Sequence, residues 1–186
     1  MINNKDFAQM RKELEQFDLN REKVIKQSRE IIKLSKLIIY SVQRGSIHEA
    51  SNNLAKIKQQ IKKLPEDNFN TGMASVARQE FVEALTFYHF MKDGKLITKA
   101  ETGIPTYEYL LGLCDLSGEL VRKAVNLVIK CKFDEADKIR NFVNEMYHEF
   151  LNFNLGNGEL RKKSDQIKWN LEKLEGIIYD LKIKRG

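Results

Sequence analysis

The sequence of 186 residues predicts an all-α fold, and three observations support this prediction. Apolar residues recur at intervals of three and four along almost the whole chain, whereas the alternation typical of strands does not occur. The sequence contains only two prolines, Pro65 and Pro105. Charged residues make up 31% of the sequence, which is typical of long helices with charged surfaces. We therefore expect a single domain, residues 1–186, built as a bundle of about six to seven long helices.

The first half of the chain contains three expected helices. The first is expected to end at Gly45, because glycine readily adopts the left-handed conformation of a helix cap. Ser46 is the expected N-cap of the second helix, and Glu49, three residues later, completes a capping box. The second helix is expected to end at Pro65, and the third follows a polar link and runs to about Asp93.

The second half contains three more expected helices. Thr98 is a cap candidate in the connector 95–104, and Pro105 stands where the first turn of a helix tolerates proline. The helix after Pro105 is expected to run to about Lys130, and the next one spans 133–153. Apolar residues of the final helix follow a heptad pattern: Leu160, Ile167, Leu171, Leu174, Ile178 and Leu181. Such a seam is suited to packing against a long neighbouring helix or a partner.

Composition and charge limit the possible functions. The net charge of +6 favours a polyanionic partner such as nucleic acid. The two cysteines, Cys114 and Cys131, have neither metal-ligand spacing nor a disulfide-rich context, so we interpret them as core thiols in a reducing compartment. A signal-peptide pattern and an apolar run of membrane-spanning length are both lacking. We therefore expect a soluble, cytoplasmic protein that does not contact a membrane.

Two carboxylates interrupt the apolar run between residues 78 and 91. Glu80 and Glu83 are three residues apart, so they share one face of a helix. A helix that is apolar nearly all round belongs in an interior, where an uncompensated carboxylate costs roughly several kcal/mol. A divalent cation would balance this charge. The alternatives are an ion pair with an Arg or Lys of a neighbouring helix, and a position facing a hydrated groove.

Asp115 and Glu119 form a second acidic pair in an apolar segment, and they are four residues apart. Helix bundles build metal sites from inward-pointing carboxylates on facing helices, and oxygen ligands favour Mg²⁺, Mn²⁺ or Ca²⁺. Glu119 is expected to pair with Arg122, three residues further on. Asp115 has no cation at helical spacing on either side, so it is the better ligand candidate.

Basic residues gather on the first long helix, where four of them follow steps of three and four residues. These four form a cationic stripe opposite the apolar face, long enough to follow several phosphates of a nucleic-acid backbone. The alternative is an ordinary solvated face. The candidate nucleic-acid-binding residues, including two that flank the stripe, are Arg21, Lys26, Arg29, Lys33, Lys36 and Arg44. The basic run 161–163 is interpreted as ordinary surface.

The two acidic segments resemble those of the translin family. The resemblance rests on EFVEALTFYHF at residues 80–90 and YLLGLCDLSGEL at residues 109–120. Within the family the match is closer to the branch of translin-associated factor X (TRAX), as an archaeal-type or stand-alone member. The C-terminal segment from Leu160 to Gly186 is more similar to translin itself. The resemblance covers nearly the whole chain from about residue 20.

The resemblance implies a protomer of about seven helices that assembles, typically as an octamer, into a hollow basket with RNA or DNA inside. In the TRAX branch it also implies metal-dependent endoribonuclease activity, and the paired glutamates of that branch fall on Glu80 and Glu83. Translin lacks acids at these positions and at that of Asp115. The remaining acid of the nuclease branch is replaced here by His148. Glu149 and Glu145 are the candidates to restore this carboxylate.

Together, the residues and the resemblance predict a metal-dependent endoribonuclease that binds single-stranded RNA within a homo-oligomer. The expected ligands of Mg²⁺ or Mn²⁺ are Glu80, Glu83 and Asp115, and Glu149 is a further candidate catalytic residue. DNA and duplex RNA are further candidate partners. The alternative is a non-catalytic RNA- or DNA-binding oligomer whose buried acids pair with basic residues. A third possibility is a purely structural helical bundle.

Overall fold

The chain forms seven α-helices in the computed structural model, which describes residues 3–66 and 68–185. No strand occurs in this described part, so the predicted all-α fold is confirmed. The helices are α1 (Asn4–Arg44), α2 (Ile47–Ile61), α3 (Met73–Asp93), α4 (Lys99–Thr102), α5 (Thr106–Ile129), α6 (Phe133–Leu151) and α7 (Glu159–Arg185).

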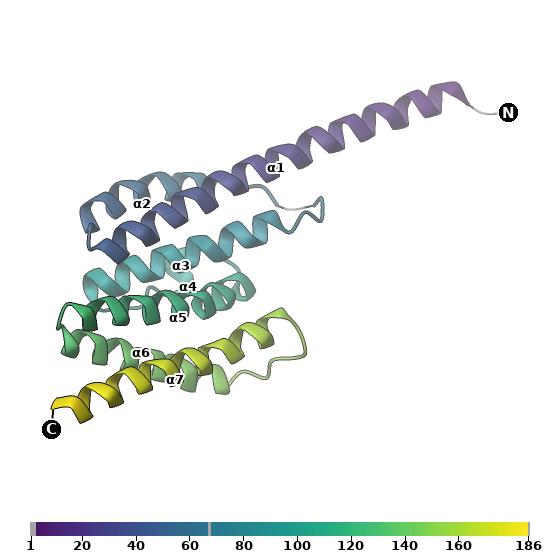
Figure 1. The fold of residues 1–186 in the computed structure, drawn as a ribbon. Coiled ribbons are helices and arrows are strands. Elements are labelled where there is room, and N and C mark those ends of the chain that lie inside the picture. Colours follow the sequence, from purple (N-terminus) through teal and green to yellow (C-terminus); the bar gives the residue numbers. More distant parts are fainter. Residues whose placement is uncertain (1–2, 67, 186) are drawn as a thin grey trace.

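The helices pack in layers, with α2 beside α1, then α3, then α5, and then α6 and α7 (Figure 1). Helix α1 packs on α2 and α3, α3 packs on α5, and α5 packs on α6 and α7. The N-terminal part of α1 projects beyond this body, and we call its residues 4–20 the arm. All of the arm except Ala8 and Asn20 is exposed. Helix α3 is thus enclosed between α1 and α5, which explains its nearly continuous apolar sequence.

The helix boundaries follow local chemistry at most positions. Gly45 caps α1 with a φ of 86°, as expected, and Thr98 forms a capping box with Glu101. The capping box expected at Ser46 is wrong, because the Ser46 side chain makes no cap hydrogen bond and Arg44 pairs with the Glu49 carboxylate at 3.1 Å. Helix α2 ends at Ile61, four residues before Pro65.

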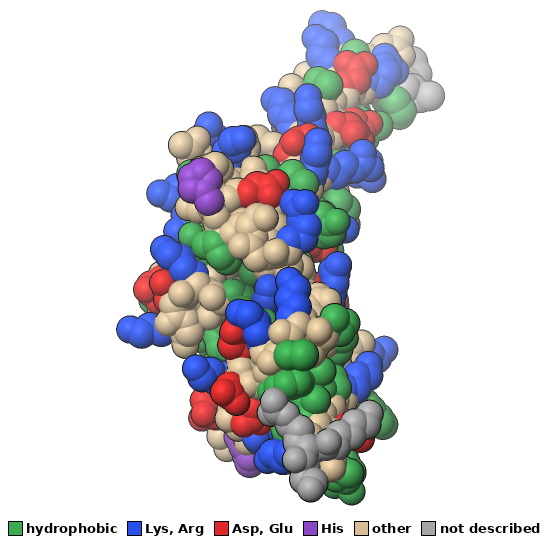
Figure 2. Space-filling model, turned by 60° about the vertical axis from the view of Figure 1, so that its left-hand side comes forward, with side chains coloured by type: hydrophobic (Ala, Val, Ile, Leu, Met, Phe, Trp, Pro, Cys, Tyr) green, Lys and Arg blue, Asp and Glu red, His purple; other side chains and the backbone are tan. Residues whose placement is uncertain are grey.

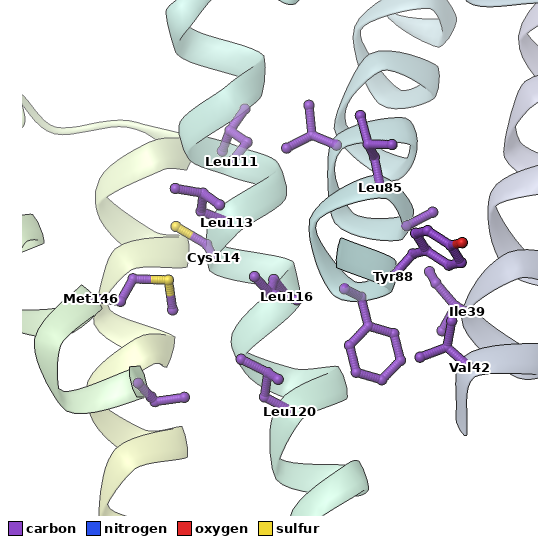
Figure 3. Packing of buried hydrophobic residues seen from close by; sticks show 14 of the residues in the cluster. Ile39, Val42, Leu85, Tyr88, Leu111, Leu113, Cys114, Leu116, Leu120 and Met146 are labelled. Atoms are coloured by element: carbon purple, nitrogen blue, oxygen red, sulfur yellow. The ribbon is translucent and has the colours of Figure 1, made fainter. Parts of the chain in front are cut away.

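The core lies along the contacts of α3 and α5 with their neighbours (Figure 3). Leu85 and Tyr88 of α3 face Ile39 and Val42 of α1 on one side of this core. The heptad seam of α7 packs within the chain against α5 and α6, and Leu181 is its only partly buried member.

The two cysteines differ in environment. Cys114 is buried in α5, and burial raises the pKa of its thiol to about 12. Cys131 is exposed in the turn after α5, where its φ is 59°. The interpretation of Cys131 as a core thiol is therefore wrong. Among the described helices, none combines the length and the apolar character needed to cross a bilayer.

Candidate functional site

Helix α3 holds the first two acids of the site. Glu80 and Glu83 alternate with the buried side chains of Phe81, Val82 and Ala84. Burial of these neighbours fixes the rotation of α3, which leaves both glutamates partly buried on one edge of the helix. The predicted shared face is confirmed, because both carboxylates line the same two hollows described below.

A close approach of α5 brings the second pair of acids toward the first. Gly112 of α5 lies against α3, and a Cβ atom at this position would be 2.7 Å from the Val82 Cβ and 2.8 Å from the Gln79 carbonyl oxygen. Only glycine fits such a contact without moving a backbone. Asp115 follows Gly112 by one helical turn. The small size of residue 112 therefore sets the separation of the acids on α3 from those on α5.

The four acids line one pocket of about 440 Å³ between α3, α5 and α7. Two of them are engaged by neighbouring side chains. Lys163 of α7 donates to the Asp115 Oδ2 at 2.6 Å, and Gln43 of α1 donates to the Glu119 Oε2 at 2.7 Å. The predicted pair of Glu119 with Arg122 is confirmed at 3.5 Å. We call Glu80, Glu83, Asp115 and Glu119 the acidic cluster.

The remaining two carboxylates of the acidic cluster, those of Glu80 and Glu83, form no hydrogen bond or ion pair with the described side chains. Burial, and then the negative charge of Asp115, Glu80 and Glu119, raises the pKa of Glu83 to about 9. Burial also raises the pKa of Glu80, against the opposing effect of the Lys36 ammonium. Fully ionised, the cluster would carry more negative charge than its protein partners neutralise, and the raised pKa values show that Glu83 and Glu80 favour their protonated forms here.

A larger hollow of about 980 Å³ lies on the other side of these glutamates, between α1, α3 and α5. We call it the groove. Arg29, Lys33 and Lys36 of the predicted cationic stripe line the groove on its α1 wall, and Glu80 and Glu83 line it on its α3 wall. The exposed ring of Tyr40 also lines it. The structure therefore brings three of the four stripe residues together with the acids, although at least 44 residues separate them in the chain.

The other predicted cations lie outside the groove. Lys26 is exposed on α1 but does not line it. Arg21 pairs with Glu22 at 3.7 Å, and Arg44 pairs with Glu49 and stacks on the Tyr40 ring at 4.6 Å. We conclude that the geometry favours Arg29, Lys33 and Lys36 over the two flanking arginines as groove residues.

Glu149 is not brought to the acidic cluster. It is exposed on α6 and lines a separate, mostly apolar hollow with His148 and Glu145. This hollow lies between α5 and α6, where Leu110 and Leu113 of α5 also line it. Neither of the two candidates for the missing acid, Glu149 and Glu145, nor His148 therefore joins Glu80, Glu83 and Asp115 in one pocket.

Lys163 is the residue that sequence reasoning missed. The basic run 161–163 reads as ordinary surface in the sequence, but Lys163 is partly buried. It connects α7 to α5 and, through a 3.3 Å contact with the Gln79 Oε1, to α3. The heptad pattern of the final helix could have indicated the partial burial of Lys163. Lys163 directly precedes Ser164, a buried seam position, so its side chain leaves α7 beside the packed face.

Comparison with known proteins agrees with this architecture. The model of the translin family matches residues 19–185. The chain belongs to the translin family. An uncharacterized translin-like relative from Methanocaldococcus jannaschii is 32% identical over 171 residues, which cover 87% of this chain and 76% of that protein. Mouse translin-associated protein X is 26% identical over 225 residues, covering 96% of this chain and 78% of that protein.

Solved structures show the same fold as this translin-family chain. The crystal structure of apo-NeC3PO superimposes with a TM-score of 0.87 at 28% sequence identity, covering 96% of this chain and 97% of that one. Because nearly all of both chains is covered, the superposition includes every helix from α1 to α7. The predicted translin-like bundle is therefore confirmed.

Proposed function

We propose that this chain is a metal-dependent endoribonuclease that binds single-stranded RNA in the groove and hydrolyses its phosphodiester bonds. One observation carries the proposal: Arg29, Lys33 and Lys36 line the same hollow as Glu80 and Glu83. The cations suit a phosphate backbone, and the carboxylates suit a metal that acts on it. The resemblance of the acidic segments at residues 80–90 and 109–120 to the TRAX branch favours a nuclease over a general polyanion binder.

The residues present fit a hard divalent cation such as Mg²⁺ or Mn²⁺. The donors are all oxygens, and the carboxylates of Glu80 and Glu83 are uncompensated although partly buried. Glu80, Glu83 and Asp115 would hold the ion, and when bound it supplies Lewis-acid activation of a phosphate and of water. As the described side chains stand, no three acidic, histidine or cysteine residues are arranged to hold a metal, and Asp115 is engaged by Lys163.

The chain's own residues have separable roles in this proposal. Arg29, Lys33 and Lys36 bind phosphates and position the strand without reading its sequence. Tyr40 offers an exposed ring on which a base of a single strand stacks. A carboxylate of the acidic cluster accepts the proton of the attacking water.

The test of catalysis is cleavage of a single-stranded RNA by purified protein with Mg²⁺ or Mn²⁺ and with chelator. The Glu80→Gln/Glu83→Gln double variant preserves side-chain shape and removes both charges, so we expect it to bind RNA without cutting it. The matched control is Glu172→Gln/Glu175→Gln, because these two exposed acids have the same spacing on α7. Equal cleavage by both double variants, or cleavage that persists in chelator, would refute the proposal.

The test of the groove is the salt dependence of RNA affinity. Single-stranded nucleic acid releases roughly 0.7 counterion per phosphate contact, so Lys33→Ala/Lys36→Ala should reduce the slope of log K against log salt by about 1.4. Lys168→Ala/Lys173→Ala removes the same charge from exposed positions of α7 and serves as control. An unchanged slope for the first pair would place the RNA elsewhere.

A second function is favoured by the ion pair of Lys163 with Asp115 and by the contacts of Glu119. If these contacts persist in solution under all conditions, the chain is a non-catalytic RNA- or DNA-binding oligomer. The cleavage assay distinguishes the two functions, because the second predicts salt-dependent binding with no metal-dependent cutting.

We also propose that the chain works as a homo-oligomer, with an octamer as the expected size. Support comes from the arm, whose exposed side chains Phe7, Met10 and Leu14 lie at heptad spacing among charges of both signs (Figure 2). Phe7→Glu/Leu14→Glu should reduce the mass measured by light scattering after size-exclusion chromatography. An unchanged mass would remove the arm from the assembly contact.

A further inference from the structure

We propose that the Lys163 ammonium competes with the divalent cation for Asp115 and thereby sets the metal concentration at which the acidic cluster is loaded. This inference rests on the proposed function, since it concerns the same site. It assigns a role to a residue of α7 that makes no contact with the groove.

The position of Lys163 is the first step of the argument. Among the described residues that line the pocket of the acidic cluster, Lys163 is the one cation beside four carboxylates. Its Nζ lies 2.6 Å from the Asp115 Oδ2 and 3.3 Å from the Gln79 Oε1. Both members of the Asp115–Lys163 pair are about three-quarters buried, which distinguishes this pair from the exposed ion pairs within single helices.

The second step is the reach of this charge. Lys163 stabilises the ionised forms of Glu80 and Glu83 as well as contacting Asp115. One ammonium therefore provides part of the positive charge that the whole cluster needs. The same oxygens would serve a divalent cation, and the lone pair of the Asp115 Oδ2 that accepts the short, charge-assisted hydrogen bond of Lys163 is withheld from the metal while that bond lasts.

The consequence is a competition between two cations for one carboxylate. Removal of the ammonium frees Asp115 and also removes a repulsive positive charge close to the metal. Both effects act in the same direction, so metal affinity should rise. If the ion pair were purely structural, loss of Lys163 would loosen the contact between α7 and α5 and move the ligand side chains apart. Metal affinity would then fall.

The experiment is direct titration of Mn²⁺ by calorimetry on the full chain. We expect Lys163→Gln to bind Mn²⁺ at least about tenfold more tightly than wild type, because one unit charge near the ion is removed in a partly buried site. Lys163→Arg retains the charge and should bind about as weakly as wild type. Lys168→Ala, on the exposed face of the same helix, is the control for net charge.

The outcomes separate this inference from the proposed function. If wild type binds Mn²⁺ and Lys163→Gln binds it equally well or more weakly, the competition is overturned, but the proposed metal site is not. Absence of Mn²⁺ binding in every variant would overturn the metal site and this inference together.

A second measurement covers a failure of Lys163→Gln to fold. In wild-type protein with ¹³C-methylated lysines, Mg²⁺ should shift the Lys163 resonance toward that of a solvated lysine, while the Lys168 resonance stays in place. A Lys163 signal that does not respond at Mg²⁺ concentrations that support RNA cleavage would overturn the competition.

Discussion

The contact of Gly112 with α3 allows a quantitative test of how the site is held together. In Gly112→Ala the added methyl group would lie 2.7 Å from the Val82 Cβ and 2.8 Å from the Gln79 carbonyl oxygen. Ordinary contacts of this kind begin near 3.4 Å, so α3 and α5 must separate by about 0.7 Å. A different rotamer offers no relief, because a Cβ position is fixed by the backbone.

The size of the effect follows from two opposing terms. Overpacking of this kind costs up to about 3 kcal/mol, whereas replacement of glycine by alanine within a helix gains about 1 kcal/mol. The net loss of about 2 kcal/mol should lower Tm by about 4–8 °C for a chain of this size. Differential scanning calorimetry measures this change.

Gly118→Ala is the matched control, because Gly118 is on the same helix and its added Cβ would meet only the Asn170 Nδ2 at 3.9 Å. This variant should raise Tm by about 2–4 °C. Gly112→Ala should also weaken Mn²⁺ binding, since it moves Asp115 away from Glu83. A Tm for Gly112→Ala equal to or above that of Gly118→Ala would refute the reasoning.

Three further predictions concern single side chains. Folding raises the pKa of Glu83 from 4.5 to about 9. The stabilising effect of its protonated form is complete below about pH 4.5 and is lost as pH rises through about 9. The Tm of wild type should therefore fall relative to that of Glu83→Gln between pH 5 and 9. A constant difference would contradict this. Lys123 donates to the Val42 and Gln43 carbonyl oxygens at the end of α1, at 2.8 and 3.1 Å, so Lys123→Ala should lose about 2 kcal/mol in urea denaturation. Lys123→Met keeps the apolar stem, so its smaller loss isolates the hydrogen bonds, and the difference from Lys123→Ala gives the lost packing. Tyr109→Phe removes the 2.7 Å hydrogen bond to the Ile97 carbonyl oxygen and should cost about 1 kcal/mol in the same assay; no loss would show that water replaces this contact.

The fold could be predicted from the sequence because its determinants are local. The spacing of apolar residues identified every long helix, and Gly45 and Thr98 marked boundaries through backbone and side-chain chemistry that acts within a few residues. The prediction of a capping box at Ser46 is wrong because the Glu49 carboxylate pairs with Arg44 instead. Local rules predict an element well but not the choice between two partners for one side chain.

The candidate site could be predicted only in part, because it depends on contacts between distant segments. Glu80 and Asp115 stood out as acids in apolar runs, and their meeting in one pocket required the docking of α3 on α5. Lys163 is 48 residues from Asp115, and no spacing rule connects them. Glu149 was placed by resemblance to a family segment, and the packing of α6 directs it to a different hollow.

The continuity of α1 links two surfaces that have different proposed roles. Asn4–Arg44 is one uninterrupted helix, so the arm and the wall that carries Arg29, Lys33 and Lys36 are parts of a single rigid rod. Any subunit that grips the outer end of this rod also fixes the orientation of the three cations. Neighbouring copies held by their arms would then present these cations in a repeating array, with a period set by assembly geometry rather than by nucleotide sequence.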